Sequence, residues 1–270
     1  MKKRRITLEE SQRASLEILK AVIKLCDQLQ LNYWITYGTL LGAVRHGGFI
    51  PWDDDLDIAM KREEYDILIN YIITHKNECS PLVVHNKYTV KKCFYNISRI
   101  CDTRYLLEFK DYDYVSGVFV DIYPYEALGD EKRYAEWMKW FKRNTKIKKF
   151  INMSCSKSFF YGKNWLNRVI NLPFCIYSKL KGNMYFLAKL DMYKPEPWEE
   201  STYIGVPCWG AAIYKNYYDS FMKIKFEDIY VNIPVKYDEI LKEAYGNYME
   251  YPPLEQRKPY HGYEAFIISE

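Results

Sequence analysis

Residues 37–57 read YGTLLGAVRHGGFIPWDDDLD, which places a glycine-led helix start before four aspartates in five residues. The preceding residues 33–36, YWIT, are typical of a short buried strand. Gly38 and Thr39 can turn that strand into a helix over residues 40–46. Unpaired N–H groups and the positive dipole end of such a helix attract phosphate, and glycine lets a ligand approach closely. The stretch therefore predicts a phosphate-binding turn beside an acidic cluster.

The acidic part of this stretch has the pattern of a strand that carries a metal site. Glycines at 47–48 should end the helix, and residues 55–58, DLDI, alternate as a strand does. A period of two puts Asp55 and Asp57 on one face, where they repel each other unless a cation lies between them. Mg²⁺ binds to carboxylates together with substrate phosphates and water, so we expect Mg²⁺ (or Mn²⁺) here. An acidic turn exposed to water is the alternative.

Residues 37–58 closely resemble the signature of the LicD family. This family includes the phosphocholine transferases of teichoic acid and, more distantly, the fukutin-type ribitol-phosphate transferases. The shared pattern is G-T-L-L-G-A-x-R-H-x-x-x-I-P-W-D-x-D-x-D, and the chain departs from it nowhere. The resemblance implies an α/β (α+β) fold with a nucleotidyltransferase-like mixed sheet flanked by helices. On this basis we expect phosphate or donor binding by Gly38, Thr39, Arg45 and His46, supported by Trp52 and Asp53.

That fold also needs a third carboxylate from a neighbouring strand. Residues 117–124, GVFVDIYP, form an apolar run with one acid, Asp121, and Pro124 should end the strand. A buried aspartate needs a partner, and Asp121 could ligate the metal or take a proton from an attacking hydroxyl. A core aspartate bonded to backbone amides is the alternative. We expect Asp55, Asp57 and Asp121 to be both the metal ligands and the catalytic carboxylates.

The end of the sequence resembles the closing pattern of the same family. Residues 238–245 have a helical pattern that Gly246 should end. A Tyr-Gly-x-Tyr-Met motif, a Pro-Pro pair, an arginine and a histidine accompany this helix end. The candidate substrate-binding residues are Tyr123, Tyr245, Arg257 and His261. For the last two, a place in a loop-rich surface tail is an equally good interpretation.

The expected reaction is metal-dependent transfer of a phospho-alcohol from a CDP-alcohol donor to a sugar hydroxyl, with release of CMP. Phosphocholine from CDP-choline is favoured by its prevalence in the family, and ribitol phosphate or glycerol phosphate is the near alternative. The expected acceptor is a lipid-linked teichoic acid or another cell-surface glycan precursor. A nucleotidyltransferase that uses a nucleoside triphosphate would need the same groups. Outside the enzymes, the alternative is an inactive metal- or lipid-binding module.

Charge is unevenly distributed along the 270 residues. Residues 137–190 contain twelve lysines and arginines and no acid, although the net charge of the chain is only +4. We therefore divide the sequence into a nucleotidyltransferase-like core (1–130), a basic, aromatic and mainly helical insertion (131–200), and a part that completes the catalytic domain (201–270).

The basic block also carries many bulky apolar and aromatic residues, which is typical of a segment that lies on an anionic membrane. Aromatic packing onto the main domain is the second interpretation, and nucleic-acid binding ranks last. No run of eighteen apolar residues occurs, and the start MKKRRITLEE lacks the apolar part of a signal peptide. Seven scattered cysteines without C-x-x-C spacing suit a reducing compartment. We expect a cytoplasmic protein, peripheral at the inner face of the membrane, with no nucleic-acid partner.

Local patterns predict the remaining elements. A capping box at residues 7–10 starts a first helix with one apolar stripe, and residues 62–75 should form a second helix. Further strands are expected at residues 82–85, 94–101 and 105–109.

Overall fold

The computed structural model describes the chain except for residues 1, 191–192, 208–210, 260 and 270. Its strands are β1 (Lys2–Arg5), β2 (Trp34–Ile35), β3 (Asp57–Lys61), β4 (Leu82–His85), β5 (Ser98–Phe109), β6 (Val115–Gly129), β7 (Tyr203–Val206), β8 (Ala211–Tyr214), β9 (Phe221–Phe226), β10 (Ile229–Pro234) and β11 (Tyr263–Ser269). Its helices are α1 (Leu8–Leu29), α2 (Tyr37–His46), α3 (Arg62–Thr74), α4 (Lys76–Cys79), α5 (Glu131–Cys155), α6 (Trp165–Lys181), α7 (Asn183–Leu190) and α8 (Tyr237–Tyr245), with short 3-10 turns η1 (Lys215–Tyr218) and η2 (Leu254–Gln256).

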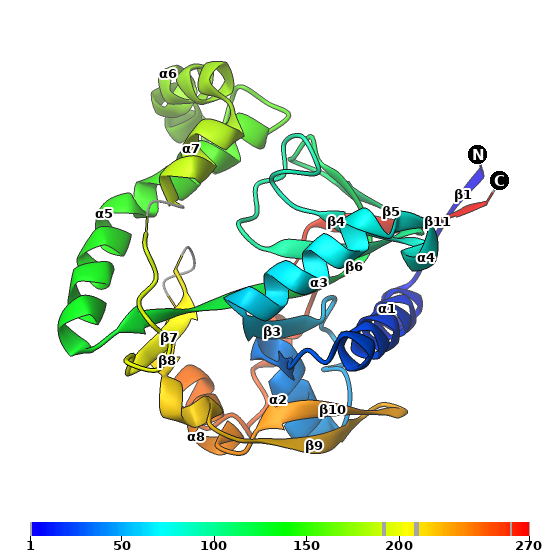
Figure 1. Ribbon diagram of the computed structural model, residues 1–270. Helices are drawn as coiled ribbons and strands as arrows, with labels where there is room; N and C mark the ends of the chain where they lie inside the picture. Colours follow the sequence, from blue (N-terminus) through cyan, green and yellow to red (C-terminus); the bar gives the residue numbers. More distant parts are fainter. Residues whose placement is uncertain (1, 191–192, 208–210, 260, 270) are drawn as a thin grey trace.

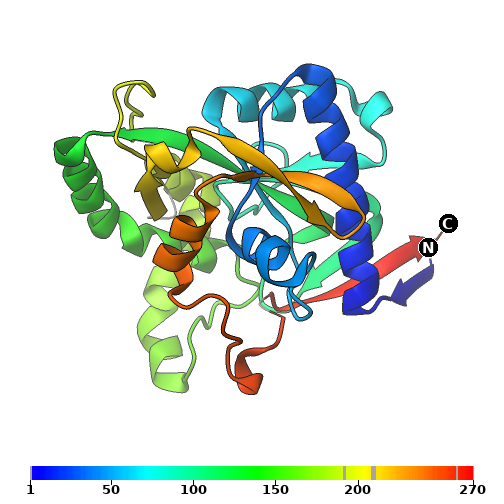
Figure 2. The same ribbon diagram turned by 90° about the horizontal axis from the view of Figure 1, so that it is seen from below.

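A mixed sheet of nine strands is the centre of the described fold, and the expected α/β architecture is confirmed (Figure 1). The strand order is β1-β11-β5-β6-β3-β2, with β4 paired to β5 and the β7–β8 pair continuing from the second half of β6. Strands β3 and β6 run parallel, whereas the other pairs in the sheet are antiparallel. Figure 2 shows α1 (blue) and α3 (cyan) along one side of this sheet, with the β9–β10 hairpin (orange) near α2.

The first helix follows its local sequence signals, so these predictions are confirmed. The Glu10 N–H donates to the Thr7 hydroxyl at 3.2 Å, and the Thr7 N–H donates to the Glu10 carboxylate at 2.8 Å, which completes the capping box. Leu19, Val22 and Cys26 are completely buried on the predicted apolar stripe. The helix predicted at 62–75 and the strand predicted at 82–85 are also present, as α3 and β4.

The starts of α2 and β3 differ from the prediction. Helix α2 begins at Tyr37, whose positive φ of 48° follows the extended Thr36 and turns the chain before the glycine. Gly38 and Thr39 therefore lie in the first turn of the helix rather than in a turn before it. Strand β3 begins at Asp57, so Asp55 precedes the strand instead of sharing a face within it.

Strand β6 does not end at Pro124, as predicted, but continues to Gly129. Pairing with β5 stops at Ile122, and pairing with β7 starts at Glu126. Pro124 therefore lies in the gap between these two pairings, where a missing N–H is tolerated, and on its other side it pairs with Met60 of β3. The two strands predicted at 94–101 and 105–109 are one strand, β5, which begins at Ser98 rather than at residue 94 and has an irregularity between Asp102 and Leu107.

Helices α5, α6 and α7 follow β6 and extend away from the sheet (Figure 1). The second half of α5 and the end of α7 reach the main core through Ile151, Phe186, Leu187 and Leu190. Within the described residues, no helix is both long and apolar enough to cross a membrane.

Candidate active site

A row of ionisable side chains crosses four adjacent strands of the sheet. His85 on β4 pairs with Arg99 on β5, Arg99 pairs with Asp121 on β6, and Asp121 pairs with Asp57 on β3. Directly paired residues project from the same face of a sheet, so the pairing register alone brings these side chains together. The row ends where β3 begins, immediately after the acidic run of the motif.

Asp55, Asp57 and Asp121 each place one carboxylate oxygen within 4.8 Å of the other two, as a shared cation requires. Asp57 and Asp121 are buried, and Asp55 is partly exposed. The Asp57 N–H donates to the Thr39 hydroxyl at 2.8 Å, which fixes the start of β3 against the first turn of α2. Thr39 therefore positions a carboxylate.

The electrostatics of the three carboxylates fit a divalent cation. Burial raises the pKa of Asp57 well above its usual value, and the negative charges of Asp55 and Asp121 raise it further. Burial, followed by the charge of Asp53, raises the pKa of Asp55 to about 8. Among the described residues, Asp57 Oδ1 is buried without a hydrogen-bond partner. A buried oxygen of this kind, surrounded by other carboxylates, is a suitable metal ligand.

Arg99 is a residue of this site that the sequence analysis missed. Its Nε donates to Asp121 Oδ1 at 2.8 Å and its Nη2 donates to Oδ2 at 3.2 Å, with the Arg99 side chain 1% exposed. The guanidinium lies 3.7 Å from the centre of the Tyr95 ring and 3.8 Å from that of Phe119. Burial raises the pKa of Asp121, and Arg99 opposes that rise. The available signal was an arginine inside the strand predicted at residues 94–101, because an arginine that is buried in a strand requires an acidic partner.

His85, at the other end of the row, predicts a pH dependence of stability. Burial, followed by the charge of Arg99, lowers the pKa of His85 to about 4. A histidine in an unfolded chain has a pKa of about 6.5, so the unfolded state binds the proton first as the pH falls. The difference between these two pKa values contributes about 3 kcal/mol to the free energy of unfolding. The contribution is fully present above pH ~6.5 and is lost as the pH falls through ~4.

Urea unfolding in EDTA between pH 7 and pH 4.5 measures this contribution. We expect His85→Gln to lose less free energy of unfolding over this range than the unsubstituted protein, because the substituted side chain does not titrate. His75→Gln, at an exposed histidine after α3, is the matched control and should behave like the unsubstituted protein. Equal losses in all three proteins would contradict the burial of His85.

Asp54 and His261 form a second contact at the site, across 207 residues of sequence. His261 Nδ1 lies 2.9 Å from Asp54 Oδ1 and 3.7 Å from Asp55 Oδ2, and the His261 N–H donates to Asp54 Oδ2 at 3.2 Å. Burial lowers the pKa of His261, but the bond to Asp54 and the charges of both aspartates outweigh it, so the pKa is raised. His261 thus lies beside the carboxylates. The alternating acids at 53, 55 and 57 predicted a metal site and gave no signal for Asp54, which lies between them.

Four other predicted residues gather around Tyr251. Arg45 donates to the carbonyls of Tyr248 and Glu250 at 2.8 and 3.1 Å. The remaining contacts place Arg257 over the rings of Trp52 and Tyr251, and the His46 ring edge-on to both. We call Arg45, His46, Trp52, Tyr251 and Arg257 the arginine–aromatic cluster.

The first turn of α2 is covered by an acid. A Cβ built on Gly38 would lie 2.7 Å from Asp53 Oδ2, so this carboxylate occupies the space next to the glycine where phosphate was expected. Burial raises the pKa of Asp53, while a hydrogen bond with Asp55 lowers it. Asp53 therefore belongs to the same acidic group as the three carboxylates.

Two tyrosines named by the sequence analysis also lie near these acids. Burial raises the pKa of Tyr123 well above its usual value, and the charge of Asp57 raises it further. Burial, followed by the charge of Asp57, likewise raises the pKa of Tyr245. The Tyr123 ring lies edge-on to that of Tyr37, 5.0 Å between centres.

The chain is similar to several known proteins. A family described as "LicD/FKTN/FKRP, nucleotidyltransferase domain" matches residues 30–166. Lipopolysaccharide cholinephosphotransferase LicD of Haemophilus influenzae is 30% identical over 280 residues, covering 98% of this chain and 100% of that protein. Ribitol 5-phosphate transferase FKRP of Homo sapiens is 40% identical over 52 residues, covering 19% of this chain and 10% of that protein.

The chain belongs to the LicD family. It is a phosphotransferase of that family, and the resemblance seen in residues 37–58 is confirmed.

Proposed function

We propose that this enzyme transfers phosphocholine from CDP-choline to a sugar hydroxyl of a cell-surface glycan precursor and releases CMP. The observation that carries the proposal is a cavity of about 250 Å³ whose lining includes four tyrosines, Tyr37, Tyr125, Tyr218 and Tyr245. Aromatic faces bind quaternary ammonium groups, and the acidic Glu243 belongs to the same lining. The cholinephosphotransferase of H. influenzae, 30% identical, supports the same substituent.

The position of this cavity also supports phosphocholine. Tyr245 lines it, and the charge of Asp57 contributes to the raised pKa of that tyrosine. Tyr37 lines it too and contacts Tyr123, which lies next to Asp57. A choline group in this cavity would therefore have its phosphate beside the carboxylates.

We propose Asp55, Asp57 and Asp121 as the ligands of Mg²⁺, or of Mn²⁺, which would neutralise charge on the diphosphate of the donor. Gly38 and the first turn of α2 supply N–H groups next to these ligands. We propose that Asp53 is a supporting acid whose carboxylate moves away from Gly38 when a phosphate binds. The catalysis proposed here consists of positioning and charge stabilisation, without a covalent nucleophile.

The arginine–aromatic cluster is our proposed site for the nucleotide part of the donor. It combines two guanidinium groups, from Arg45 and Arg257, with the aromatic rings of Trp52 and Tyr251 and the ring of His46. Guanidinium groups bind phosphate, and aromatic rings stack on a base.

For the acceptor proton, the geometry favours the Asp54–His261 pair over Asp121. Both oxygens of Asp121 already accept hydrogen bonds from Arg99. His261 is held by Asp54 and lines a cavity of about 760 Å³ between the sheet and helices α5 and α7. We propose that the acceptor hydroxyl enters there and passes its proton to this pair.

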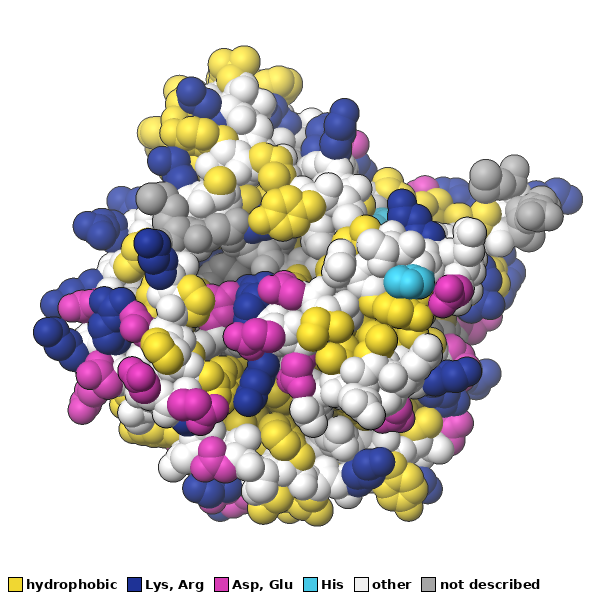
Figure 3. Space-filling model, in the orientation of Figure 1, with side chains coloured by type: hydrophobic (Ala, Val, Ile, Leu, Met, Phe, Trp, Pro, Cys, Tyr) yellow, Lys and Arg dark blue, Asp and Glu magenta, His cyan; other side chains and the backbone are white. Residues whose placement is uncertain are grey.

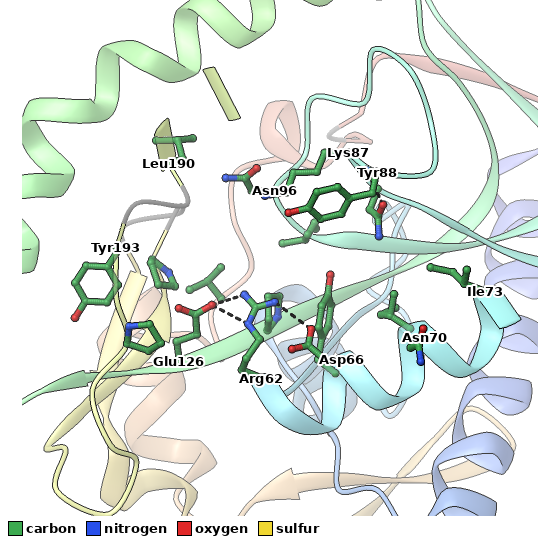
Figure 4. Close-up of a pocket in the computed structure, with 18 residues that line it drawn as sticks. Arg62, Asp66, Asn70, Ile73, Lys87, Tyr88, Asn96, Glu126, Leu190 and Tyr193 are labelled. Atoms are coloured by element: carbon green, nitrogen blue, oxygen red, sulfur yellow. Dashed lines mark hydrogen bonds and ion pairs between the residues drawn. The ribbon is translucent and has the colours of Figure 1, made fainter. Parts of the chain in front are cut away.

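The acceptor cavity is continued by a second one of about 630 Å³, shown in Figure 4, because Asn96 and Leu190 line both. Polar and apolar side chains both line it, and the polar ones include the Arg62–Glu126 ion pair from α3 and β6. Within the described residues, Asn96 Oδ1 is buried without a partner. Hydrogen-bonding groups of this kind suit the hydroxyls of a glycan chain, so we propose that the acceptor extends along this groove.

The acceptor we propose is a lipid-linked teichoic acid precursor or a comparable glycan. We propose that the enzyme works in the cytoplasm, as a peripheral protein at the inner face of the membrane. The three-part division of the chain at residues 130 and 200 also stays a proposal. Ribitol phosphate or glycerol phosphate is the alternative substituent, and the short match to FKRP is its support.

The test is to incubate the purified protein with CDP-choline, CDP-ribitol or CDP-glycerol, with Mg²⁺ or EDTA, and to quantify CMP with and without a glycan acceptor. We expect metal-dependent CMP release with CDP-choline. CMP release with CDP-ribitol alone would show that the transferred group is a polyol phosphate and not phosphocholine. If no CMP is released from any of the three donors in the presence of a competent acceptor, a nucleoside triphosphate donor or a binding module would be favoured.

A substitution in the tyrosine cavity tests the choline site itself. Tyr245→Leu should raise KM for CDP-choline about three- to tenfold, since one cation–π contact at a half-exposed ring such as Tyr245 contributes about 0.5–1.5 kcal/mol. Its matched control is Tyr230→Leu, at an exposed tyrosine on β10, which should leave KM unchanged. An unchanged KM in Tyr245→Leu would remove the cavity from the donor site.

A further inference from the structure

Helix α6 has its polar side buried and its apolar side exposed. Asn171, Cys175 and Ser178 are its buried residues, at a spacing that defines one stripe of a helix. Asn171 accepts a hydrogen bond from Lys149 of α5 at 2.8 Å and donates to the Tyr161 carbonyl at 2.9 Å. Small polar side chains thus hold α6 against its neighbours, which reverses the usual arrangement of a surface helix.

The exposed side of α6 consists largely of bulky apolar residues. Trp165 is 74% exposed and Leu180 is 82% exposed, at opposite ends of the helix. The others that are exposed between them are Leu166, Val169, Ile170, Phe174, Ile176 and Tyr177. Figure 3 shows hydrophobic side chains together with lysine and arginine at this end of the molecule. A large apolar surface on a water-soluble domain marks an interaction site.

The positive charge around this surface indicates which kind of partner it binds. Residues 137–190 carry twelve lysines and arginines and no acid, and exposed Lys163, Arg168 and Lys181 lie on or next to α6. A second copy of the chain would bring two positive surfaces together. Nucleic acid would pair with the cations but not with leucine, valine and isoleucine. An anionic bilayer accepts both kinds of side chain.

Helices α5 and α6 of the basic block differ in this respect. Trp137 and Ile151 of α5 are almost completely buried, so packing onto the rest of the protein explains them. Packing onto the rest of the protein does not explain why Trp165 and Leu180 of α6 are apolar, because both are largely exposed. The membrane interpretation of the sequence therefore applies to α6 and its flanks.

We propose that the exposed face of α6, from Trp165 to Leu180, docks this protein on an anionic lipid bilayer. The apolar side chains enter the boundary between headgroups and acyl chains, and the flanking cations face lipid phosphates. Docking itself does not depend on the proposed function. Only its purpose rests on that function, because docking would bring the enzyme to a lipid-linked acceptor.

Flotation with lipid vesicles tests docking on the full chain, without any nucleotide or acceptor. Vesicles of equal parts phosphatidylglycerol and phosphatidylcholine should bind the protein, and pure phosphatidylcholine should bind it at least about tenfold more weakly. Trp165→Ser with Leu180→Ser should reduce binding to the anionic vesicles at least about tenfold. The matched control is Tyr230→Ser with Leu254→Ser, which removes two comparably exposed apolar side chains elsewhere and should bind normally.

Brominated lipid separates insertion from simple charge attraction. It should quench tryptophan fluorescence in the unsubstituted protein and quench it less in Trp165→Phe, because Trp165 is expected at the acyl boundary. Equal binding of all variants, or equal quenching, would overturn the proposal. Self-association that the α6 substitutions abolish, without vesicle binding, would assign the face to a second copy instead.

The same variants distinguish this inference from the proposed function. The α6 double variant should release CMP from CDP-choline with a water-soluble acceptor as fast as the unsubstituted enzyme. Vesicle binding without any transfer activity would leave docking supported and the donor assignment wrong. Transfer activity without vesicle binding would support the donor assignment and contradict docking.

Discussion

Asp57→Asn should lower kcat at least about 10³-fold, because it removes a proposed metal ligand at the centre of the site. The fold should survive. Asparagine keeps the shape of the side chain, and it removes a buried acid whose pKa is raised by burial and by the charges of Asp55 and Asp121. The melting temperature in EDTA should therefore stay equal or rise. Added Mg²⁺, which we expect to stabilise the unsubstituted protein, should no longer do so.

Two measurements check this result, CMP release and thermal unfolding with and without Mg²⁺. Asp219→Asn, at an exposed aspartate after η1, is the matched control and should change neither. An Asp57→Asn enzyme that keeps most of its activity would show that Asp57 does not hold the metal. Lost activity together with lost structure would leave the metal role unsupported, and Mg²⁺ binding to the unsubstituted protein would then decide it.

Arg99→Ala should reduce the free energy of unfolding by about 3–5 kcal/mol, a large effect for a residue that touches no substrate in our proposal. The substitution leaves the Asp121 carboxylate buried without its positive partner, and it also opens a space between the Tyr95 and Phe119 rings. Urea unfolding in EDTA at pH 7 measures the loss. The matched control is Arg4→Ala, which breaks an exposed ion pair with Glu10 and should leave the free energy of unfolding almost unchanged.

A double-mutant cycle separates the ion pair from the packing of the arginine. Arg99→Met combined with Asp121→Leu should recover most of the stability, since an apolar pair of similar size has no charge to bury. The same double variant should be inactive if Asp121 holds the metal. A loss below about 1 kcal/mol in Arg99→Ala would contradict the buried ion pair.

Local signals in the sequence were sufficient for much of the fold. The capping box at Thr7, the apolar stripe of α1 and the glycines after α2 act through neighbours in the chain, and their consequences were predicted. The start of α2 was misplaced because Tyr37, a residue that seldom adopts a positive φ, makes the turn there. Strand β6 was cut short because Pro124 usually ends a strand, and its tolerated position depends on where β5 and β7 stop.

The side-chain arrangement of the site was less accessible. The motif identified Asp55 and Asp57 as neighbours, but the order His85, Arg99, Asp121 and Asp57 depends on the register of three strand pairs. Register is set by the packing of the whole sheet rather than by any one strand. The contact of His261 with Asp54 was hidden for the same reason, because it joins residues 207 positions apart.

The ion pair between Arg99 and Asp121 also restricts how this sequence can evolve. A single change at either position passes through a protein with an unpaired buried charge, and that cost is a substantial part of the 5–15 kcal/mol that typically stabilises a domain. Changing both positions together avoids the cost but removes a carboxylate from the proposed metal site. Position 99 should therefore drift as slowly among descendants of this gene as the carboxylate that it neutralises.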